Sequence, residues 1–343
     1  MKKLLNTLFV TMPDTYLSLD GENIVVKNED SILARYPLHN LEGICTFGYA
    51  GVSPALMGSC AERNIALTFM TRNGRFLARV IGESRGNVVL RKEQYRISDH
   101  EGRSAAVARN MILGKIYNSK WILERATRDY PLRVDVNRMK QITASLTESM
   151  RLVRDVQNLE ILRGFEGSAA VQYNSVFDDL ILQQKECFYF HGRNKRPPLD
   201  NVNALLSFVY TLLASDMCSA LEAVGLDAYV GFLHRDRPGR ASLALDMMEE
   251  LRGVFADRLV LSLINKRIIQ PKGFHKKENG AVIMDEDTRK LVLKAWQEKK
   301  QDKIIHPYLG DKISWGLVPY AQSLLLARYI RGDLDEYPPF LWK

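Results

Sequence analysis

The sequence predicts an α+β fold, in which a small N-terminal β-sandwich or barrel-like domain precedes a larger all-α domain. Short apolar strands and turn signals fill the first quarter of the chain. From about Glu93 onward, apolar residues recur with the 3.6-residue period of helices. With 343 residues, of which 46% are hydrophobic, the chain is long enough to bury two cores. We place the boundary at residue 88, giving domains of residues 1–88 and 89–343.

The N-terminal domain is expected to begin with strands joined by hairpins. Residues 1–12 are predicted to form a first strand, because their apolar run is too short for a signal peptide and meets Pro13. Polar and apolar residues alternate over 15–27 around Asp20-Gly21, a typical hairpin turn. Further strands are expected at 44–47, 65–69 and 76–81, the last after a second hairpin turn at Asn73-Gly74.

One short helix is expected inside the β domain, where Ser53 suits the N-cap and Pro54 the first turn. The helices of the second domain follow from apolar periodicity, with a hinge over residues 129–135 that contains Pro131. They are expected at 93–126, 136–146, 158–182, 198–223, 242–255, 260–268, 285–297 and 315–331.

Composition limits the cellular setting and the class of partner. The four cysteines show no Cys-x-x-Cys spacing, which argues against a structural zinc site and favours free thiols in a reducing compartment. No apolar run approaches the roughly 20 residues that span a bilayer, so a cytoplasmic protein without a membrane partner is expected. The formal charge of +8 suits nucleic acid or another polyanion but does not decide the matter alone.

The most informative segment is residues 231–252, which joins a histidine, a Pro-Gly turn with three arginines and an acidic helix. Asp246 and Glu249 are three residues apart, so a helix places both on one face, where the turn can bring His234 alongside. Histidine and carboxylates without thiolate favour Mn²⁺ or Mg²⁺. The alternative is a solvated acidic face paired with Arg252. Three further arginines near the turn are candidates for phosphate contacts: Arg235, Arg237 and Arg240.

A second carboxylate, Glu166, lies on the apolar stripe of a predicted helix together with Ala170, Tyr173 and Phe177. Burying a carboxylate is costly unless it is paired or bound to metal. A functional role and a simple ion pair with Arg163 both remain open at this point. Lysines at positions 272, 276 and 277 are expected to form a loop that contacts phosphate. Taken one by one, these and the neighbouring basic residues are ordinary surface cations.

Several blocks of this sequence resemble the CRISPR-associated spacer-acquisition integrase/endonuclease family, in members of type I systems. The first block is Leu162-Arg-Gly-Phe-Glu-Gly-Ser-Ala-Ala170, followed by Tyr173. The second is Arg196-Pro-Pro-Leu-Asp-Asn-Val-Asn-Ala-Leu-Leu-Ser-Phe208, followed by residues 210–213. The third comprises residues 225–227, 231–234 and 239–252. Their order and spacing hold along essentially the whole chain.

The resemblance implies a metal-dependent DNA integrase and endonuclease of CRISPR adaptation, with Glu166, His234 and Glu249 as ligands of Mn²⁺ or Mg²⁺. Asp246 matches a further acidic position near the ion and is included among the catalytic candidates. The implied reaction joins the 3′-hydroxyl ends of captured DNA fragments to a CRISPR repeat by transesterification. Candidate DNA contacts are Arg163, Arg235, Arg237, Arg240, Arg252, Lys272, Lys276 and Lys277.

The resemblance also implies a set of partners. The N-terminal domain is expected to form a homodimer, and its small size supports this, because its apolar strands need a further surface to cover them. Two dimers are expected to bind a small ferredoxin-like dimeric partner in a four-to-two complex, with an iron–sulfur nuclease as a further partner. The substrates are double-stranded, branched and splayed DNA.

Two rival functions remain. His234-Arg235-Asp236-Arg237 also fits the His-x-x-Arg pattern of tyrosine recombinases, which use a covalent tyrosine and no metal, but this leaves Glu166 and Glu249 without a role. The other rival is a DNA-binding scaffold without catalysis, whose acidic residues only pair and cap. Activity lost in EDTA and restored by Mn²⁺ distinguishes the integrase from both.

Overall fold

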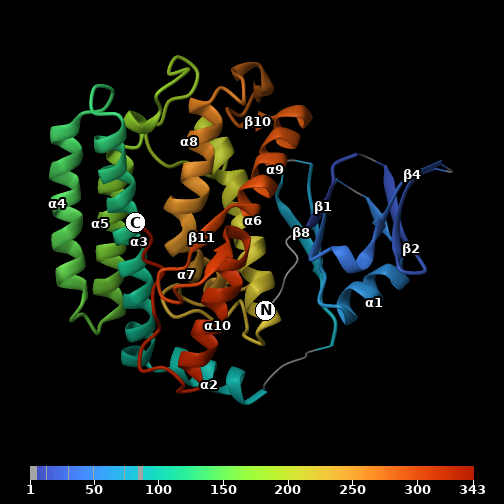
Figure 1. Ribbon diagram of the computed structural model, residues 1–343, viewed down its shortest axis with the longest axis horizontal. Helices are drawn as coiled ribbons and strands as arrows, with labels where there is room; N and C mark the ends of the chain where they lie inside the picture. The colour runs from blue at the N-terminus through green and yellow to red at the C-terminus, as the bar shows by residue number, and fades with distance from the viewer. Residues whose placement is uncertain (1–5, 13, 30, 49, 73, 84–87) are drawn as a thin grey trace. The chain divides into compact units, whose positions relative to one another are not determined.

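The computed structural model describes residues 6–12, 14–29, 31–48, 50–72, 74–83 and 88–343. The chain divides into two compact units. The first contains residues up to Arg85 together with Met284–Asp302 and Ser314–Leu317. The second contains Gly86–Ile283, Lys303–Ile313 and Val318–Lys343. Strands of the N-terminal part precede a long helical part, as Figure 1 shows by its colours, so the predicted α+β class is confirmed.

Two four-stranded sheets form the N-terminal part of the first unit. One has the strand order β1-β5-β7-β8 and the other β4-β3-β2-β6. The hairpin predicted around Asp20-Gly21 is present, with β2 and β3 paired antiparallel. The second predicted turn includes Asn73, which lies outside the described residues. The strands are β1 Thr7–Val10, β2 Thr15–Asp20, β3 Asn23–Asn28, β4 Ser31–Pro37, β5 Gly43–Phe47, β6 Gly51–Val52, β7 Ala66–Met70 and β8 Phe76–Val80.

Helix α1, Pro54–Glu62, explains why part of this unit is parallel. Strands β1, β5 and β7 pair parallel, and parallel neighbours need a crossover connection, which α1 supplies between β5 and β7. The predicted cap is present, because the Ser53 side chain accepts a hydrogen bond of 3.2 Å from the Leu56 amide. Leu56 and Cys60 of the helix join a buried cluster with residues of both sheets, such as Leu17 and Ile44.

The first unit also takes in a helix from the C-terminal part of the sequence. Helix α9, Glu286–Gln301, begins at Asp285, whose side chain accepts a hydrogen bond of 2.8 Å from the Thr288 amide. Trp296 of this helix is fully buried. Near it, the Lys299 ammonium lies 5.7 Å from the ring centre of Trp315. Residues distant in the sequence from the N-terminal strands therefore belong to the same compact unit.

The second unit is built on helices that pack against the long helix α3. In Figure 1, α4 and α5 lie beside α3, which also contacts α7. Asn158 caps α5 by accepting a hydrogen bond of 3.0 Å from the Ile161 amide, and Asp200 caps α6 in the same way at Asn203. The helices are α2 Val88–Ser98, α3 Glu101–Asp129, α4 Val136–Val153, α5 Leu159–Ser175, α6 Asn201–Ala223, α7 Ser242–Leu251, α8 Arg258–Asn265 and α10 Val318–Ile330.

The predicted helices all differ from the structure in at least one bound; α4, for example, continues to Val153 instead of ending at residue 146, and three further differences are informative. The helix expected over 93–126 is two helices, because α2 ends at Ser98 and α3 starts anew at Glu101. The helix expected over 158–182 ends at Ser175. The helix expected over 242–255 gives way at Arg252 to a π-helix, Arg252–Asp257, which leads directly into α8.

Short strands account for the lysine-rich segment that the sequence suggested was a loop. Strands β9 Phe274–Lys276 and β10 Val282–Met284 form a two-stranded sheet, and β11 Lys303–Ile305 pairs with β12 Lys312–Ser314 in another. Lys272 lies in a 3-10 turn just before β9, Lys276 in β9 and Lys277 just after it, and all three are exposed. The segment is therefore an exposed hairpin.

Helix α6 is long and apolar enough to cross a membrane by length and composition, with a mean hydropathy of 1.5. This corrects the expectation that no segment approaches that length. Within the described residues it is the one helix that passes this test, and 61% of its most apolar stretch is buried inside the protein. Its apolarity thus matches its position in the helical core.

Candidate active site

Helices α3, α5 and α7 bring two predicted site residues, Glu166 and Glu249, to one cation. The ammonium of Lys115 on α3 contacts a carboxylate oxygen of Glu166 on α5. Its nitrogen also lies 2.7 Å from Oε2 of Glu249 on α7. Lys115 and Glu249 are buried, and Glu166 is about a quarter exposed. The sequence offers no local signal for Lys115, since it precedes Glu166 by 51 positions and sits in a helix of ordinary composition.

Glu249 is ionised in spite of its burial. Burial alone raises the pKa of a carboxyl group, but Arg252 and Lys115 outweigh it and hold the pKa of Glu249 at about 2. The Arg252 guanidinium lies 2.6 Å from Oε1 of Glu249 and stacks over the ring of Tyr210, 4.8 Å from its centre. Arg252, predicted as a DNA contact, is therefore engaged with Glu249. The alternative of a solvated acidic face paired with Arg252 is therefore right about the pair but wrong about the face, because Asp246 and Glu249 are buried.

Asp246 and His234 form the second part of the site. Asp246 is completely buried and accepts hydrogen bonds from the amides of Phe232, Leu233 and His234, at 2.7, 2.9 and 3.0 Å. Its Oδ1 also contacts Nδ1 of the His234 ring. Both oxygens of Asp246 are thus occupied, and the ring is held so that Nε2 is the nitrogen left for another partner.

Gly231 allows the chain to close over Asp246. A Cβ atom at this position would lie 2.7 Å from Oδ2 of Asp246 and 2.9 Å from the backbone carbon of Ser242. Both distances are far below normal contact, and the second atom is backbone, so a larger residue would push the loop away. The sequence Gly231-Phe-Leu-His therefore fixes the position of His234 through a close approach that glycine alone permits.

A buried hydrogen-bond network lies next to these residues and was not predicted. Asp257, at the end of the π-helix, accepts hydrogen bonds from the hydroxyls of Tyr210, at 2.5 Å, and Tyr173, at 3.2 Å. Burial raises the pKa of Asp257 to about 6, although the tyrosine hydrogen bonds and Arg252 act in the opposite direction. The Arg193 guanidinium stacks on the ring of Tyr210, 5.3 Å from the ring centre.

The donor types at this site, two glutamates and a histidine, are ones that Mn²⁺ or Mg²⁺ accepts. Glu249 is buried and ionised, and its Oε2, although near Lys115, receives no hydrogen bond of ordinary geometry. A histidine oriented through its other nitrogen by a carboxylate is the arrangement common behind metal-binding histidines. As they stand, no three histidine, cysteine or acidic side chains among the described residues are grouped tightly enough to hold a metal. The Lys115 ammonium supplies the positive charge between the two glutamates.

The predicted DNA contacts differ in their availability. Arg163 pairs with Glu160 at 2.6 Å and donates a hydrogen bond of 2.8 Å to the Leu233 carbonyl, so the alternative of pairing with Glu166 is wrong. Arg235 also pairs with Glu160. Arg237 is exposed and Arg240 partly exposed, and in the part of the chain described here neither forms an ion pair.

Comparison with known proteins identifies the family. A profile of the family described as CRISPR associated protein Cas1 matches residues 8–298. The chain is 49% identical over 343 residues to CRISPR-associated endonuclease Cas1 1 of Chlorobaculum tepidum, covering 100% of both chains. The chain belongs to the Cas1 family. The resemblance in the sequence blocks is thereby confirmed.

Further comparisons agree with membership of the Cas1 family. CRISPR-associated endonuclease Cas1 2 of Rhodospirillum rubrum is 47% identical over 347 residues, with 100% of both chains covered. A casposase bound to an integration product shares the fold, with a TM-score of 0.84 and 22% identity over 98% of this chain and 93% of its own. A Cas1 protein from Thermotoga maritima, also at 22% identity, has a TM-score of 0.81 over 95% of this chain and 97% of its own.

All four cysteines are free, as the sequence predicts. Cys45, Cys60 and Cys218 are buried, and burial raises the pKa of the Cys60 thiol to about 11. A thiol with so high a pKa is a poor nucleophile and a poor metal ligand at neutral pH. Cys60 is therefore unsuited to either role.

Proposed function

We propose that this protein is a divalent-metal-dependent DNA endonuclease and integrase of CRISPR adaptation, which joins 3′-hydroxyl ends of captured DNA to a CRISPR repeat. The observation that carries the proposal is the convergence of Glu166 and Glu249 on one cationic position, in a chain of the Cas1 family. The names of relatives such as the Chlorobaculum tepidum endonuclease support the nuclease activity. A non-catalytic scaffold gives no reason to bury an ionised glutamate against a lysine.

In the proposed mechanism, Glu166, Glu249 and Nε2 of His234 would hold the metal, which would supply Lewis-acid chemistry toward the phosphodiester and the attacking hydroxyl. Asp246 fixes the tautomer and the position of His234 without being a ligand itself, because its oxygens are engaged by three amides and the ring. Arg252 keeps Glu249 ionised. Arg237 and Arg240, which lie on the turn before α7, are proposed to contact the phosphates of the DNA.

The test is strand transfer of a 3′-hydroxyl end into a repeat-containing DNA. Alanine at Glu166, His234 or Glu249 should abolish the reaction, and a double variant should be little worse than either single one, because the ligands act as a unit. The control is Glu160→Ala, which removes an exposed carboxylate from the same helix as Glu166. Wild-type activity should vanish in EDTA and return with Mn²⁺.

Two results would refute the proposed site. Full strand transfer by a well-folded Glu166→Ala protein would exclude the metal site. Activity in EDTA would favour the recombinase alternative, which uses a covalent tyrosine. That alternative receives no support from Tyr173 and Tyr210, whose hydroxyls both donate to Asp257 in the interior.

We further propose the partners that the family resemblance implies. Residues 1–88 would form the dimerisation domain and residues 89–343 the catalytic domain of a cytoplasmic homodimer. Strand β4, at the edge of its sheet, exposes Ile32, Leu33 and Tyr36, an apolar edge that favours a protein partner. Double-stranded, branched and splayed DNA, the ferredoxin-like partner in a four-to-two complex and the iron–sulfur nuclease complete the proposal.

A further inference from the structure

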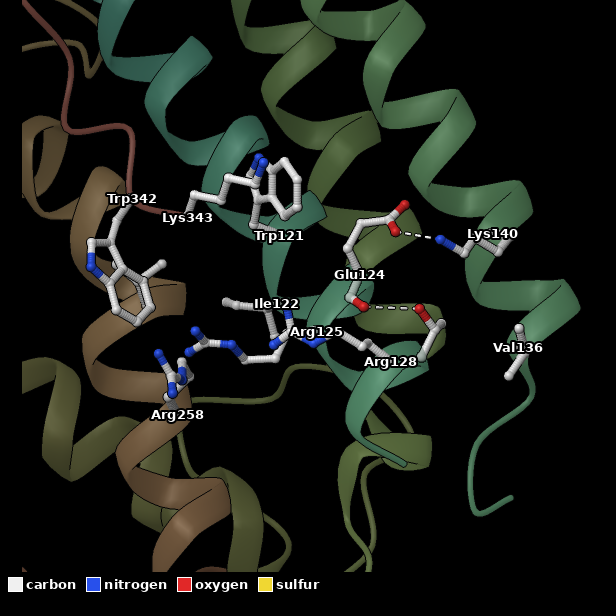
Figure 2. Close-up of a pocket in the computed structure, with 12 residues that line it drawn as sticks. Trp121, Ile122, Glu124, Arg125, Arg128, Val136, Lys140, Arg258, Trp342 and Lys343 are labelled. Carbon is white, nitrogen blue, oxygen red and sulfur yellow. Dashed lines mark hydrogen bonds and ion pairs between the residues drawn. The ribbon is translucent and has the colours of Figure 1, made fainter. Parts of the chain in front are cut away.

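A cavity of about 400 Å³ lies in the helical unit, away from the carboxylates of the proposed metal site. Its walls come from the C-terminal half of α3, the start of α4, the junction of the π-helix with α8, and the last residues of the chain. Figure 2 shows the side chains that face it. None of the predicted site residues lines this cavity.

Two arginines flank one indole in the cavity wall. The Arg125 and Arg258 guanidinium carbons lie 5.2 and 4.7 Å from the ring centre of Trp342 (Figure 2). In the described residues neither arginine has a carboxylate within ion-pair distance. Burial, and then repulsion from Arg125, lowers the pKa of Arg258. Asp129 attracts both arginines from beyond ion-pair distance, but its carboxylate is held by Arg128, so a position for a further anion remains beside them.

The acidic residue that lines the cavity does not fill this position. Glu124 is held by the Lys140 ammonium, as the dashed line in Figure 2 shows. Arg128 lies at the rim and pairs with Asp129 at 2.9 Å. The cavity therefore keeps a net positive charge that comes from Arg125 and Arg258.

A second, independent observation comes from Trp121 in the same wall. Its indole Nε1 is buried and has no hydrogen-bond partner. That atom has almost no accessible surface, so a ligand in the cavity does not reach it. The Trp121 ring instead carries the Lys343 ammonium, 4.3 Å from the ring centre, which adds a third cation to the wall. The three cations together call for an anionic ligand rich in oxygen acceptors.

We propose that this cavity binds a phosphate-bearing nucleotide unit, with the phosphate between Arg125 and Arg258. The volume decides against inorganic phosphate alone, since about 300–1,000 Å³ is the range of sites for larger organic ligands. The source is a DNA strand, in keeping with the proposed function on which this inference rests, and a free mononucleotide shares the same chemistry. The cavity is thus a second anchoring point for DNA, separate from the metal site.

The experiment uses the full-length protein and its intrinsic fluorescence, because two of the four tryptophans, Trp121 and Trp342, line the cavity. The probes are oligo(dT) of about 20 nucleotides, dTMP and inorganic phosphate. Oligo(dT) should quench the fluorescence with an affinity that falls steeply with salt. Quenching by dTMP as well would show that a free nucleotide suffices, and quenching by oligo(dT) alone would show that a phosphodiester is required.

The Arg125→Gln, Arg258→Gln double variant should bind oligo(dT) about tenfold more weakly and lower the log–log salt slope by about 0.7, since one neutralised phosphate of a single strand contributes about that much. The control is Arg151→Gln, on the far part of α4, about 16 Å along the helix from Lys140. Wild-type affinity and slope in the double variant would overturn the proposal, as would equal quenching by inorganic phosphate alone.

Two further measurements keep the result interpretable. Circular dichroism and urea unfolding check the fold, and if Arg258→Gln does not fold, Arg125→Gln alone should still weaken oligo(dT) binding severalfold. Strand transfer by the arginine variants is measured in parallel, because the cavity and the metal site share no residue. Loss of the nucleotide site together with intact strand-transfer chemistry would overturn this inference only, whereas intact quenching without metal-dependent activity would overturn the proposed function only.

Discussion

Replacing Lys115 by methionine tests whether its ammonium stands in for the metal. Methionine keeps the unbranched stem and removes the charge, so Glu166 and Glu249 would face each other with Arg252 as their nearest cation. At 2.7 Å and an effective dielectric constant of 20, the Lys115–Glu249 attraction amounts to about 6 kcal/mol before desolvation. Breaking a buried pair lowers the free energy of unfolding by roughly 3–5 kcal/mol. Because Arg252 would still neutralise Glu249 in the variant, we expect a loss of about 3 kcal/mol. In EDTA, Tm should fall by roughly 6–12 °C.

The same variant should gain affinity for Mn²⁺. Metal must displace the Lys115 ammonium from the two glutamates in the wild type, and a release of about 3 kcal/mol corresponds to a Kd at most roughly 150-fold tighter. Saturating Mn²⁺ should therefore restore most of the lost Tm. The matched control is Lys290→Met, which breaks a pair with Glu286 of the same 2.7 Å length on an exposed helix face.

Scanning calorimetry in EDTA and in Mn²⁺, with isothermal titration for the metal, decides the matter. The control should change stability by no more than about 1 kcal/mol in either buffer, as exposed pairs do. If Lys115→Met binds Mn²⁺ more weakly, or loses the same Tm with and without metal, Lys115 supports the carboxylates instead of competing with the ion. The reasoning above would then be refuted.

Three other predictions follow from particular contacts. Asp246→Asn should lower the free energy of unfolding in urea by about 2–3 kcal/mol, because an amide side chain cannot accept hydrogen bonds from three backbone amides and His234. It should also lower strand transfer by about tenfold or more with DNA binding intact, and unchanged activity would contradict this. Asp257 has a pKa of about 6 in the folded protein and near 4 in the unfolded chain, so its protonation favours the folded state. This contribution to the free energy of unfolding, roughly 3 kcal/mol, is fully present below pH 4 and is lost as pH rises through 6. Asp257→Asn should therefore flatten urea midpoints measured from pH 4.5 to 7, whereas an unchanged slope would argue against the assignment. Ile32→Glu should shift the protein toward monomer in sedimentation velocity; a wild-type monomer would contradict the dimer.

Local signals were enough to predict much of the fold. The Asp20-Gly21 hairpin and the Ser53 cap of α1 depend on neighbouring residues, and both are present. The break between α2 and α3 could not be seen in the same way. His100 caps α3 by accepting from the Arg103 amide, and histidine is not among the residues that signal a helix start.

The sequence predicted the relative positions of site residues only where those residues lie close together in the chain. Asp246 and Glu249 were expected on one helix face, but their partners come from elsewhere: the Gly231–His234 loop closes on one and Lys115 of α3 on the other. Lys115 and Asp257 carry no local pattern that sets them apart from other lysines and aspartates. Their roles arise from helix packing, which a single sequence does not reveal.

The π-helix between α7 and α8 fixes the orientation of the residues that follow it. It fits an extra residue into the turn compared with an α-helix, and Gly253 within it faces Ile122 so closely that a Cβ atom would lie 2.8 Å from the Ile122 side chain. Winding the same residues as an α-helix would carry one residue into the next turn and rotate everything downstream by about 100°. Asp257 would leave its tyrosines and Arg258 would leave Trp342. The winding of residues 252–257 therefore positions both Asp257 in the interior network and Arg258 in the cavity wall, so a change in this winding would disrupt both together.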